Sequence, residues 1–511
     1  FAVRRRQGVI TTDDGPIDGR SGVAVLMRYT LRLLTSQQFQ RAATLVCAAE
    51  LERRRDPSTW GEEPFRIGLW VGMDVTPKYV ADAADQIQQA NEQTRRRLPV
   101  LQVKRCPWCG TRIEAKHVRA DLDRTRVFVR CGDPKARCPF SEGGSVEDGL
   151  PILTVDEEIY HLAPTFLIAT VDKFARLARE GAAASILGYV REWCPRHGYT
   201  HDDDRSCSSS HNAKAPLPAA KRQMVDRLRP PDLVIQDELH LITGSLGTTV
   251  GLFETAIDVL CSWRTSDGRH VQPLVVASSA TVRQARDQVH DLYGRGVTMF
   301  PPQVLDASDT FFSYDVPISR ATPGRRYVGV SASGVRMVHA EIRVAEVLLA
   351  AGQTLLDREP PDAATSAVDP YLTLVGYFST TRELAGMNRY LKDDIYTATS
   401  RGRRGIPLSR RYGTLGVEYH LAELTARASG ADIGETLDDM AVAFDPRFDS
   451  SGGRAALRAT DEKDRPSRKE RPFDAILATS MLQVGVDVSR LGLMVMVGQP
   501  KNTAEYIQAS S

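Results

Sequence analysis

The 511-residue sequence lacks the long apolar runs that membrane-spanning and exported proteins carry. No stretch approaches the roughly eighteen consecutive apolar residues that a transmembrane helix needs, so none is expected. No apolar signal-peptide core follows the basic cluster Arg4, Arg5 and Arg6. A cytoplasmic location, with no membrane partner, is therefore the default expectation.

The sequence also has almost no excess of positive over negative charge, and it has few cysteines. Lysine and arginine number 66 against 64 acidic residues, so a nucleic-acid site must be a local patch rather than a global field. Eight cysteines in a long chain without an export signal argue against disulfides. The length exceeds what one hydrophobic core supports and predicts two or three domains.

A Gly-rich phosphate loop ending in Gly-Lys-Ser or Gly-Lys-Thr is missing from the sequence as well. Such a loop supplies backbone N–H groups and a lysine to bound phosphates. The chain starts at Phe1 rather than at Met, and Ser511 stands inside what reads as a motif. We therefore expect a fragment of a longer protein.

Short apolar strands alternate with helices, a pattern that predicts α/β domains with parallel sheets covered on both faces. The sequence divides into a first domain over 1–297, a Pro- and Gly-containing linker over 298–335 and a second domain over 336–511. The first domain carries a small inserted module at about 101–150 and a polar insertion at about 194–216. The predicted strands lie at 23–27, 68–71, 166–170, 233–236, 274–277, 371–377, 474–478 and 493–497, the predicted helices at about 31–54 and 79–97, and the predicted loops at 401–415 and 450–472.

One apolar strand, 233–236, runs directly into the acidic pair Asp237 and Glu238, with His240 two residues on. Ligands of open α/β sheets bind at the carboxyl ends of the strands. Phosphoryl transfer needs a metal ion near the phosphates and a group that orients the attacking water. Asp237 suits the Mg²⁺, Glu238 the water, and His240 the γ-phosphate. The alternative is a strand that ends in a solvated acidic turn.

The run Ser279-Ala280-Thr281 follows another apolar strand some forty residues later. Its Ser279 and Thr281 hydroxyls suit hydrogen bonds to the acidic box, which would couple hydrolysis to domain movement. By itself the triplet is an ordinary turn at the end of a strand. Its position some forty residues after the acidic pair Asp237 and Glu238 supports a functional interpretation.

Two further blocks, at 478–488 and 505–511, complete a recognisable order. In this order the four blocks resemble motifs II, III, V and VI of superfamily 2 helicases, with Gly485 and Asp487 matching motif V and Gln508 the first residue of motif VI. The resemblance implies two RecA-like lobes with ATP and Mg²⁺ between them. It also implies a phosphate loop upstream of Phe1 and a motif VI arginine beyond Ser511. The fragment alone is therefore expected to hydrolyse ATP poorly or not at all.

Weaker matches to motifs Ia, Ib and IV suggest contacts with a nucleic-acid backbone. For the first of these, a helix with a basic face is an equally good interpretation. The candidate contacts are Arg28, Thr30, Arg32, Thr35, Gln38, Thr170, Lys173, Ser379, Thr380, Arg382 and Thr479.

The exact residues of three runs indicate one family within this superfamily. The runs at 28–35, 235–240 and 497–511 resemble the DrmA family, the helicase-like proteins of bacterial DISARM antiphage systems. That resemblance implies a helicase or translocase that acts on phage DNA with a DrmB-like partner. The alternatives are a DNA repair or restriction-type translocase of the same superfamily, and a non-hydrolysing DNA clamp. Intact Asp237 and Glu238 argue against the clamp.

The cysteines form two candidate metal sites. Cys106, Cys109, Cys131 and Cys138 have the spacing C-x₂-C-x₂₁-C-x₆-C, which predicts a structural Zn²⁺, since four cysteines leave no open coordination position. Cys194, His197, Cys207 and His211 form a second candidate set, with His201 as a competing ligand. Alternatively, these are buried thiols and surface histidines. Cys47 and Cys261 lie in apolar helical stretches and are expected in the core.

Overall fold

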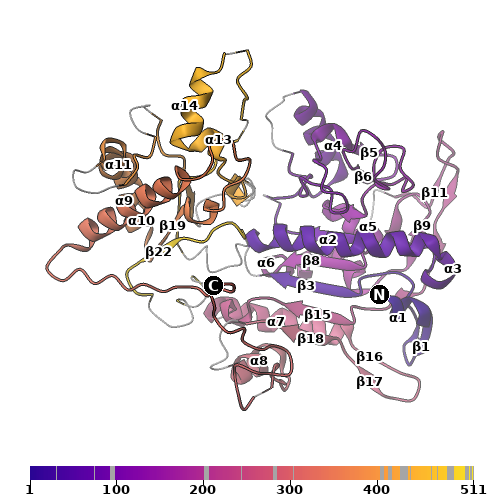
Figure 1. Cartoon of the computed structure of the whole chain (residues 1–511). Coiled ribbons are helices and arrows are strands. Elements are labelled where there is room, and N and C mark those ends of the chain that lie inside the picture. Colours follow the sequence, from indigo (N-terminus) through magenta and orange to yellow (C-terminus); the bar gives the residue numbers. More distant parts are fainter. Residues whose placement is uncertain are drawn as a thin grey trace. The chain divides into compact units, whose positions relative to one another are not determined.

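The computed structural model divides into two compact units, Phe1–Gly294 and Arg295–Ser511 (Figure 1). The division falls close to the predicted end of the first domain at residue 297. No helix among the described residues is long and apolar enough to cross a membrane. The structure describes residues 1–511 except 30–31, 74, 93–97, 176, 201–206, 243, 280–284, 303, 403–407, 413–416, 426–435, 438, 462, 469, 480–487, 501–505, 507–508 and 510–511.

A six-stranded sheet forms the centre of the first unit, and its strands are parallel in the order β18-β15-β3-β8-β4-β7. Each predicted strand of this domain is present, with shifts of a residue or two at 23–27 and 68–71. Because the strands are parallel, their carboxyl ends meet at one edge of the sheet, which is where ligands of such sheets bind. The strands are β3 (Val25–Tyr29), β4 (Ile67–Trp70), β7 (Ile152–Leu153), β8 (Phe166–Thr170), β15 (Leu233–Gln236) and β18 (Leu274–Ala277).

Helices enclose this sheet. Leu26, Leu167 and Val234 point from three strands into one cluster with residues of α5 (Asp156–Leu162), α6 (Val171–Phe174), η3 (Gly181–Leu187) and α7 (Gly244–Cys261). The long helix α2 (Arg32–Arg55), predicted at about 31–54, contacts β3, β4 and β8 instead. Burial of both faces explains why the strands read as nearly continuous apolar runs.

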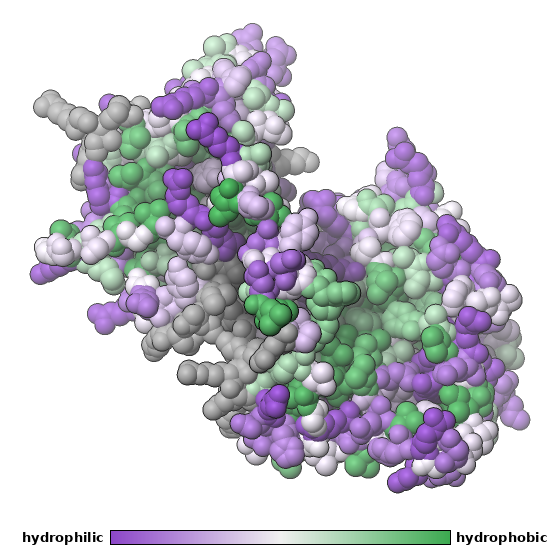
Figure 2. Space-filling view, turned by 60° about the horizontal axis from the view of Figure 1, so that its bottom comes forward, coloured by the Kyte–Doolittle hydropathy of each residue, from purple (hydrophilic) through white to green (hydrophobic). Residues whose placement is uncertain are grey.

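The strand β18 is an exception, because it forms an edge of the sheet. Its Leu274 and Val276 are 64% and 47% exposed, although an apolar strand of this kind was expected to be buried. On the neighbouring helix α7, Leu252 and Val259 are 74% and 69% exposed. Figure 2 turns the side of the molecule that bears α7 and β18 forward and shows hydrophobic side chains gathered there.

Small elements surround the sheet or build the two insertions. The 101–150 module contains the antiparallel pair β5–β6, and the 194–216 insertion, predicted as a polar surface segment, contains short antiparallel strands. These elements are α1 (Ala2–Gln7), β1 (Val9–Thr12), β2 (Gly15–Asp18), α3 (Pro57–Trp60), α4 (Val80–Glu92), η1 (Ala115–His117), β5 (Val118–Asp121), β6 (Arg126–Val129), η2 (Leu177–Arg179), β9 (Glu192–Cys194), β10 (Gly198–Thr200), β11 (Ser210–His211), β12 (Ala220–Lys221), β13 (Gln223–Met224), β14 (Arg227–Leu228), η4 (Leu239–Leu241), β16 (Trp263–Arg264), β17 (His270–Val271) and α8 (Ala285–Tyr293).

The second unit has a four-stranded parallel sheet in the order β20-β21-β19-β22. Three of its strands were predicted, and β20 was not. No helix or strand occurs among the described residues of the predicted linker at 298–335. The elements are α9 (Met337–Leu356), η5 (Asp369–Tyr371), β19 (Leu374–Phe378), α10 (Thr381–Tyr390), η6 (Leu391–Ile395), α11 (Tyr396–Arg401), β20 (Leu421–Leu424), α13 (Pro446–Asp449), α14 (Ser451–Ala459), β21 (Ala475–Ala478) and β22 (Met494–Val497).

One loop prediction was wrong. The segment 450–472 was expected to be a loop because it is Gly-rich and of mixed charge, yet it begins with helix α14. The Ser450 side chain accepts a hydrogen bond of 2.9 Å from the Gly453 N–H and so caps the helix. An N-terminal cap of this type stabilises a helix by about 1 kcal/mol, which offsets about half of the poor helix propensity of two glycines.

Candidate active site and metal centres

The acidic pair lies at the carboxyl end of β15, between two neighbouring strands. The Asp237 N–H donates to the Arg28 carbonyl at the end of β3, at 3.1 Å. On the other side, the Ser278 N–H donates to the Gln236 carbonyl and the Leu239 N–H to the Ser278 carbonyl, both at 2.9 Å. The Ser278 hydroxyl also donates to the Asp237 carboxylate. Asp237 is thereby held at the rim of the sheet by both neighbouring strands.

Glu238 adopts the left-handed backbone conformation, with φ 51° and ψ 49°. A non-glycine residue rarely adopts this conformation, and such strain concentrates at functional sites. The turn ends β15 and starts η4, so that Glu238 Oε2 lies 3.2 Å from His240 Nδ1. Both side chains are about one-fifth exposed, at 20% and 19%. The site is therefore sheltered but still open to solvent.

The charges of the site influence one another. Burial, followed by the neighbouring Asp237 charge, raises the pKa of Glu238 above its ordinary value. Burial lowers the pKa of His240, against the opposing effect of Asp237. Gln288, from helix α8, donates to the carbonyls of Leu239 and Ile242 at 2.8 and 3.0 Å and so holds the turn.

Sequence reasoning did not single out Ser278, whose hydroxyl donates to the Asp237 carboxylate. The signal was present, because Ser278 is the first residue after β18 and immediately precedes the predicted Ser279. Ser279 is half-buried, and Thr281 lies outside the described residues. The predicted second-domain residues Gly485, Asp487 and Gln508 also lie outside them.

Two predicted nucleic-acid contacts are buried in the first unit. Arg28 is fully buried, forms an ion pair with Glu254 of α7 and lies over the Phe174 ring. Lys173 is also buried and donates to the Val71 carbonyl at 2.9 Å and to Asp156 at 2.6 Å. Both cations neutralise buried carboxylates, a role that the sequence pattern did not reveal. We therefore leave them out of the surface that is proposed to contact nucleic acid.

The other candidates differ in exposure. Thr170 and Thr479 are buried, and Gln38 is half-buried. Ser379 and Arg382 are exposed, while Thr380 caps helix α10 by accepting from the Glu383 N–H at 3.2 Å. Thr30 and the side chains of Arg32 and Thr35 are outside the part of the chain that the structure describes.

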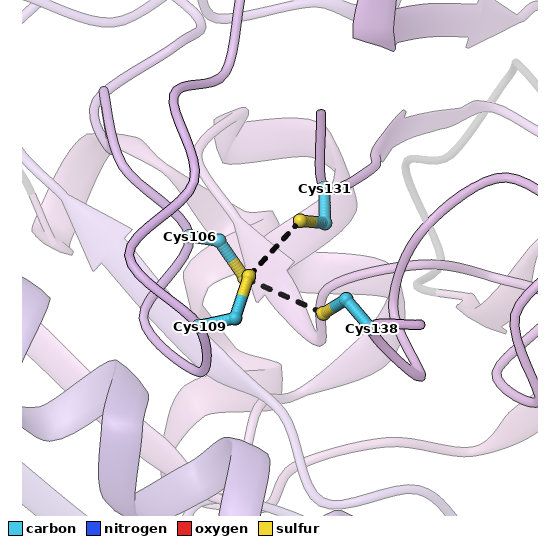
Figure 3. Close-up of side chains that lie close together, drawn as sticks. All are labelled: Cys106, Cys109, Cys131 and Cys138. Atoms are coloured by element: carbon cyan, nitrogen blue, oxygen red, sulfur yellow. Dashed lines mark hydrogen bonds between the residues drawn. The ribbon is translucent and has the colours of Figure 1, made fainter. Parts of the chain in front are cut away.

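The four cysteines of the 101–150 module converge on one point (Figure 3). Their sulfur atoms all lie within 4.8 Å of one another, with 3.8 Å between Cys106 and Cys138 and 3.4 Å between Cys109 and Cys131. A disulfide has a sulfur separation of about 2.05 Å, so these are not disulfides. In a tetrahedral zinc site with Zn–S bonds of about 2.3 Å, the sulfurs are about 3.8 Å apart. The arrangement has the geometry of a Cys₄ zinc centre.

Two glycines shape this centre for different reasons. Gly110 has φ +76°, and its N–H donates to the Cys106 carbonyl at 2.9 Å, which closes the first turn. At Gly132 a Cβ would lie 2.2 Å from the Arg112 carbonyl oxygen, so no side chain fits there. Trp108 is half-exposed and packs edge-on against Phe140 of the same module.

The second predicted set, Cys194, His197, Cys207 and His211, also comes together, with all four ligand atoms within 4.8 Å of one another. Cys47 and Cys261 lie outside both clusters and are buried, as predicted for core residues.

No known family model matches the chain. Over 503 residues, 96% of its length, the chain is 36% identical to the DISARM protein DrmA of Bacillus paralicheniformis. The chain is a homologue of DrmA. The resemblance to DrmA that the motifs indicate is therefore confirmed. The chain spans 40% of the length of that DrmA.

Two solved structures share a low overall likeness with this chain. The DUF1998 helicase MrfA bound to DNA aligns with a TM-score of 0.37 and 12% identity, over 96% of this chain and 42% of that one. Cas3 of T. fusca with ATP aligns with a TM-score of 0.32 and 14% identity, over 96% and 41%. Neither score is high enough to bear on the fold or the function.

Proposed function

We propose that this chain is part of the motor of a superfamily 2 helicase or translocase that hydrolyses ATP and acts on DNA in antiphage defence. The main support is the pair Asp237 and Glu238 at the carboxyl edge of a parallel sheet, joined to the next strand by Ser278. DrmA is a DISARM protein, which supports the defence role. On this proposal the two units are RecA-like lobes.

The residues fit a magnesium nucleotide. Asp237 offers carboxylate oxygens, the ligand type that Mg²⁺ prefers, and the Ser278 hydroxyl fixes their direction. A bound Mg²⁺ neutralises charge that develops on the β- and γ-phosphates during transfer. Glu238, with a raised pKa, orients the attacking water and accepts its proton. His240 lies beside Glu238 and contacts the γ-phosphate of the bound nucleotide.

Other residues of the chain complete the proposed motor. Gly485, Asp487 and Gln508 contribute to the nucleotide site from the second unit, and Ser279 and Thr281 couple the site to movement. Contacts with the DNA backbone come from Thr30, Arg32, Thr35, Gln38, Ser379, Thr380 and Arg382, and are largely independent of base sequence. The buried Thr170 and Thr479 are left out, as Arg28 and Lys173 are. A DrmB-like protein is the proposed partner.

We also propose that Cys106, Cys109, Cys131 and Cys138 hold a structural Zn²⁺. Four cysteines close the coordination shell, so the ion organises the module rather than binding substrate. Around it, Gln40 and Thr44 of α2 donate to the carbonyls of Arg105 and Pro107 at 3.2 and 3.1 Å. The centre thereby fixes the module to the helix that covers the main sheet.

The deciding experiment measures ATP turnover by the full-length protein with and without DNA. We expect DNA to stimulate turnover and Glu238→Gln to abolish it while nucleotide binding persists. DNA binding with no turnover in the unmodified protein would overturn the proposal in favour of a clamp. Turnover by Glu238→Gln at the normal rate would overturn the assignment of Glu238.

A further inference from the structure

A second group of metal-ligating side chains lies in the 194–216 insertion, apart from the acidic pair and from the four cysteines. Cys194 ends strand β9, His197 lies in the turn to β10, and Cys207 and His211 belong to the segment that forms β11. The spacing C-x₂-H-x₉-C-x₃-H brings two pairs of ligands from two separate turns. We propose that these four residues form a second, structural zinc site that closes the insertion.

Distances within the group agree with a tetrahedral ion. Cys194 Sγ lies 3.8 Å from His197 Nδ1, and Cys207 Sγ lies 3.4 Å from His211 Nε2. With Zn–S bonds of about 2.3 Å and Zn–N bonds of about 2.05 Å, a tetrahedral site has S···N edges of about 3.5 Å. The two histidine rings are packed edge to face with centroids 4.8 Å apart. All four ligand atoms lie within 4.8 Å of one another.

The remaining ring nitrogens have partners of the kind that metal-bound histidines use. His197 Nε2 lies 3.2 Å from the Asp123 carbonyl oxygen, so it donates there and leaves Nδ1 for the metal. His211 Nδ1 lies 3.4 Å from the Ser208 hydroxyl, which leaves Nε2 for the metal. Such contacts fix the tautomer and the direction of the ring. In both histidines one ring nitrogen contacts an oxygen and the other faces a cysteine sulfur, which is the arrangement of a metal ligand.

Burial and charge point to a closed, structural site. Cys194, Cys207 and His197 are 0%, 3% and 8% exposed. Two thiolates balance the charge of Zn²⁺, so the complete site is neutral, and a neutral site is far less costly to bury than an isolated charge. The Arg222 guanidinium lies near Cys207 and pairs with Glu192 at 3.1 Å. Four protein ligands leave no position for a substrate.

The site also joins the insertion to the Cys₄ module. The Asp123 carbonyl that orients His197 lies in the turn between β5 and β6, and the Asp123 carboxylate pairs with Lys214 of the insertion at 2.6 Å. Strand β13, which follows the insertion, pairs with β9, so the ion would close a sheet of three short strands, β10-β9-β13. Loss of this ion should therefore loosen the β5–β6 hairpin as well.

The test is the metal content of purified protein, by elemental analysis per chain. We expect two zinc ions, one in Cys207→Ser, and two in His211→Cys, because a thiolate replaces the imidazole as a ligand. Cys261→Ala removes a buried thiol outside both clusters and should retain two ions. One ion in the unmodified chain, unchanged by Cys207→Ser, would overturn the proposal and leave only thiol–imidazole hydrogen bonds.

Two measurements guard against a variant that fails to fold. In unmodified protein reconstituted with Co²⁺, thiolate-to-metal absorption should correspond to six thiolates per chain rather than four. Only four would refute the second site. In Cys207→Ser that folds, hydrogen exchange in Val118–Asp121 and Arg126–Val129 should rise, because the contact that His197 makes with Asp123 is no longer held. Unchanged exchange there would refute the link between the modules.

Discussion

The hydroxyl of Ser278 donates a hydrogen bond to the carboxylate of Asp237 and lies 3.4 Å from the Glu238 N–H. It thus joins the end of β18 to the acidic end of β15. Asp237 Oδ1 accepts this hydrogen bond and a second one from the Glu238 N–H at 3.0 Å. The carboxylate therefore presents its remaining lone pairs in a fixed direction, which favours a metal ion with strict octahedral geometry. The strand order β18-β15-β3 makes this contact possible.

Ser278→Ala should weaken the response of ATP turnover to Mg²⁺. Loss of a residue that orients a metal ligand typically costs about 10- to 100-fold in metal affinity or activity. We expect the Mg²⁺ concentration for half-maximal turnover by the full-length protein to rise about tenfold. Ser278→Thr keeps the hydroxyl and should remain near the unmodified value. An unchanged Mg²⁺ response in Ser278→Ala would show that this contact does not serve the metal.

Glu238→Gln should abolish turnover without unfolding the protein. The amide cannot accept the proton of the attacking water, a loss of about 100-fold or more. Because glutamine has nearly the same shape, the strained backbone at this position is expected to stay as it is. Glu142→Gln, a change at a side chain that is 91% exposed, serves as the control. Equal rates in the two variants would contradict the role of Glu238, and loss of nucleotide binding would point to misfolding.

The pH dependence of turnover follows from the same residue. Burial and the Asp237 charge raise the pKa of Glu238, so its carboxylate becomes protonated at a higher pH than an ordinary glutamate. Turnover should therefore fall on acidification through that raised pKa. The measurement is kcat against pH in the full-length protein. A flat acid limb down to the ordinary glutamate range would contradict the site environment.

Most strands of the two sheets were predictable because each is a short apolar run that ends in a turn, whereas the two-residue β7 and the strand β20 were not predicted. Leu233–Gln236, Phe166–Thr170 and Leu274–Ala277 have the bounds that the sequence suggested. Helix α14 escaped prediction since its two glycines hide a capped start at Ser450. The exposure of β18 was not predicted. An apolar composition shows that a strand is able to be buried, but it does not show whether another element covers the strand.

The carboxylates of the candidate site were predicted from the sequence, but the residues that hold the acidic turn, Ser278 and Gln288, were not. Asp237 and Glu238 follow a strand directly, so local sequence reveals them. Ser278 and Gln288 reach the acidic turn only through the pairing of β15 with β18 and the position of α8. Arg28 looked like a phosphate contact because a sequence cannot show that Glu254, more than two hundred residues away, meets it inside the core.

Removal of zinc from the Cys₄ centre should destabilise the first unit. Since a structural metal binds only the folded module, its binding free energy is folding free energy, on the order of several kcal/mol or more. We expect Cys109→Ser to lower the zinc content by one ion and to lower the melting temperature, measured calorimetrically. A chelator should lower the melting temperature of the unmodified protein in the same way. Full zinc content in Cys109→Ser would contradict the centre.

The buried pair Arg28 and Glu254 should matter for folding rather than for DNA contact. Arg28→Met leaves a buried carboxylate without its cation and should cost about 3–5 kcal/mol in unfolding free energy. Adding Glu254→Leu should recover most of that loss. A phosphate contact would instead reduce the slope of log K for DNA against log salt by about one. An unchanged slope in the double variant is therefore expected, and a reduced slope would restore Arg28 to the DNA surface.

Glu158 should make stability fall as the pH rises. It is 1% exposed, accepts from the Val127 N–H at 2.7 Å and from Arg126 at 3.3 Å, and so joins α5 to β6. Burial raises its pKa from 4.5 to about 7, despite the opposing effect of Arg126. Between these two values the folded chain holds a proton that the unfolded chain has lost, so each rise in pH favours unfolding.

Glu158→Gln removes this dependence and keeps the oxygen that accepts from Val127. Its unfolding free energy relative to the unmodified chain should therefore increase from pH 5 to pH 8, by roughly 3 kcal/mol at most. Denaturant titrations at several pH values measure the difference, and Glu142→Gln should follow the unmodified chain. If the unfolding free energies of Glu158→Gln and of the unmodified chain changed with pH in parallel, the prediction would be contradicted. The ion pair with Arg126 would then outweigh burial and keep the Glu158 carboxylate ionised.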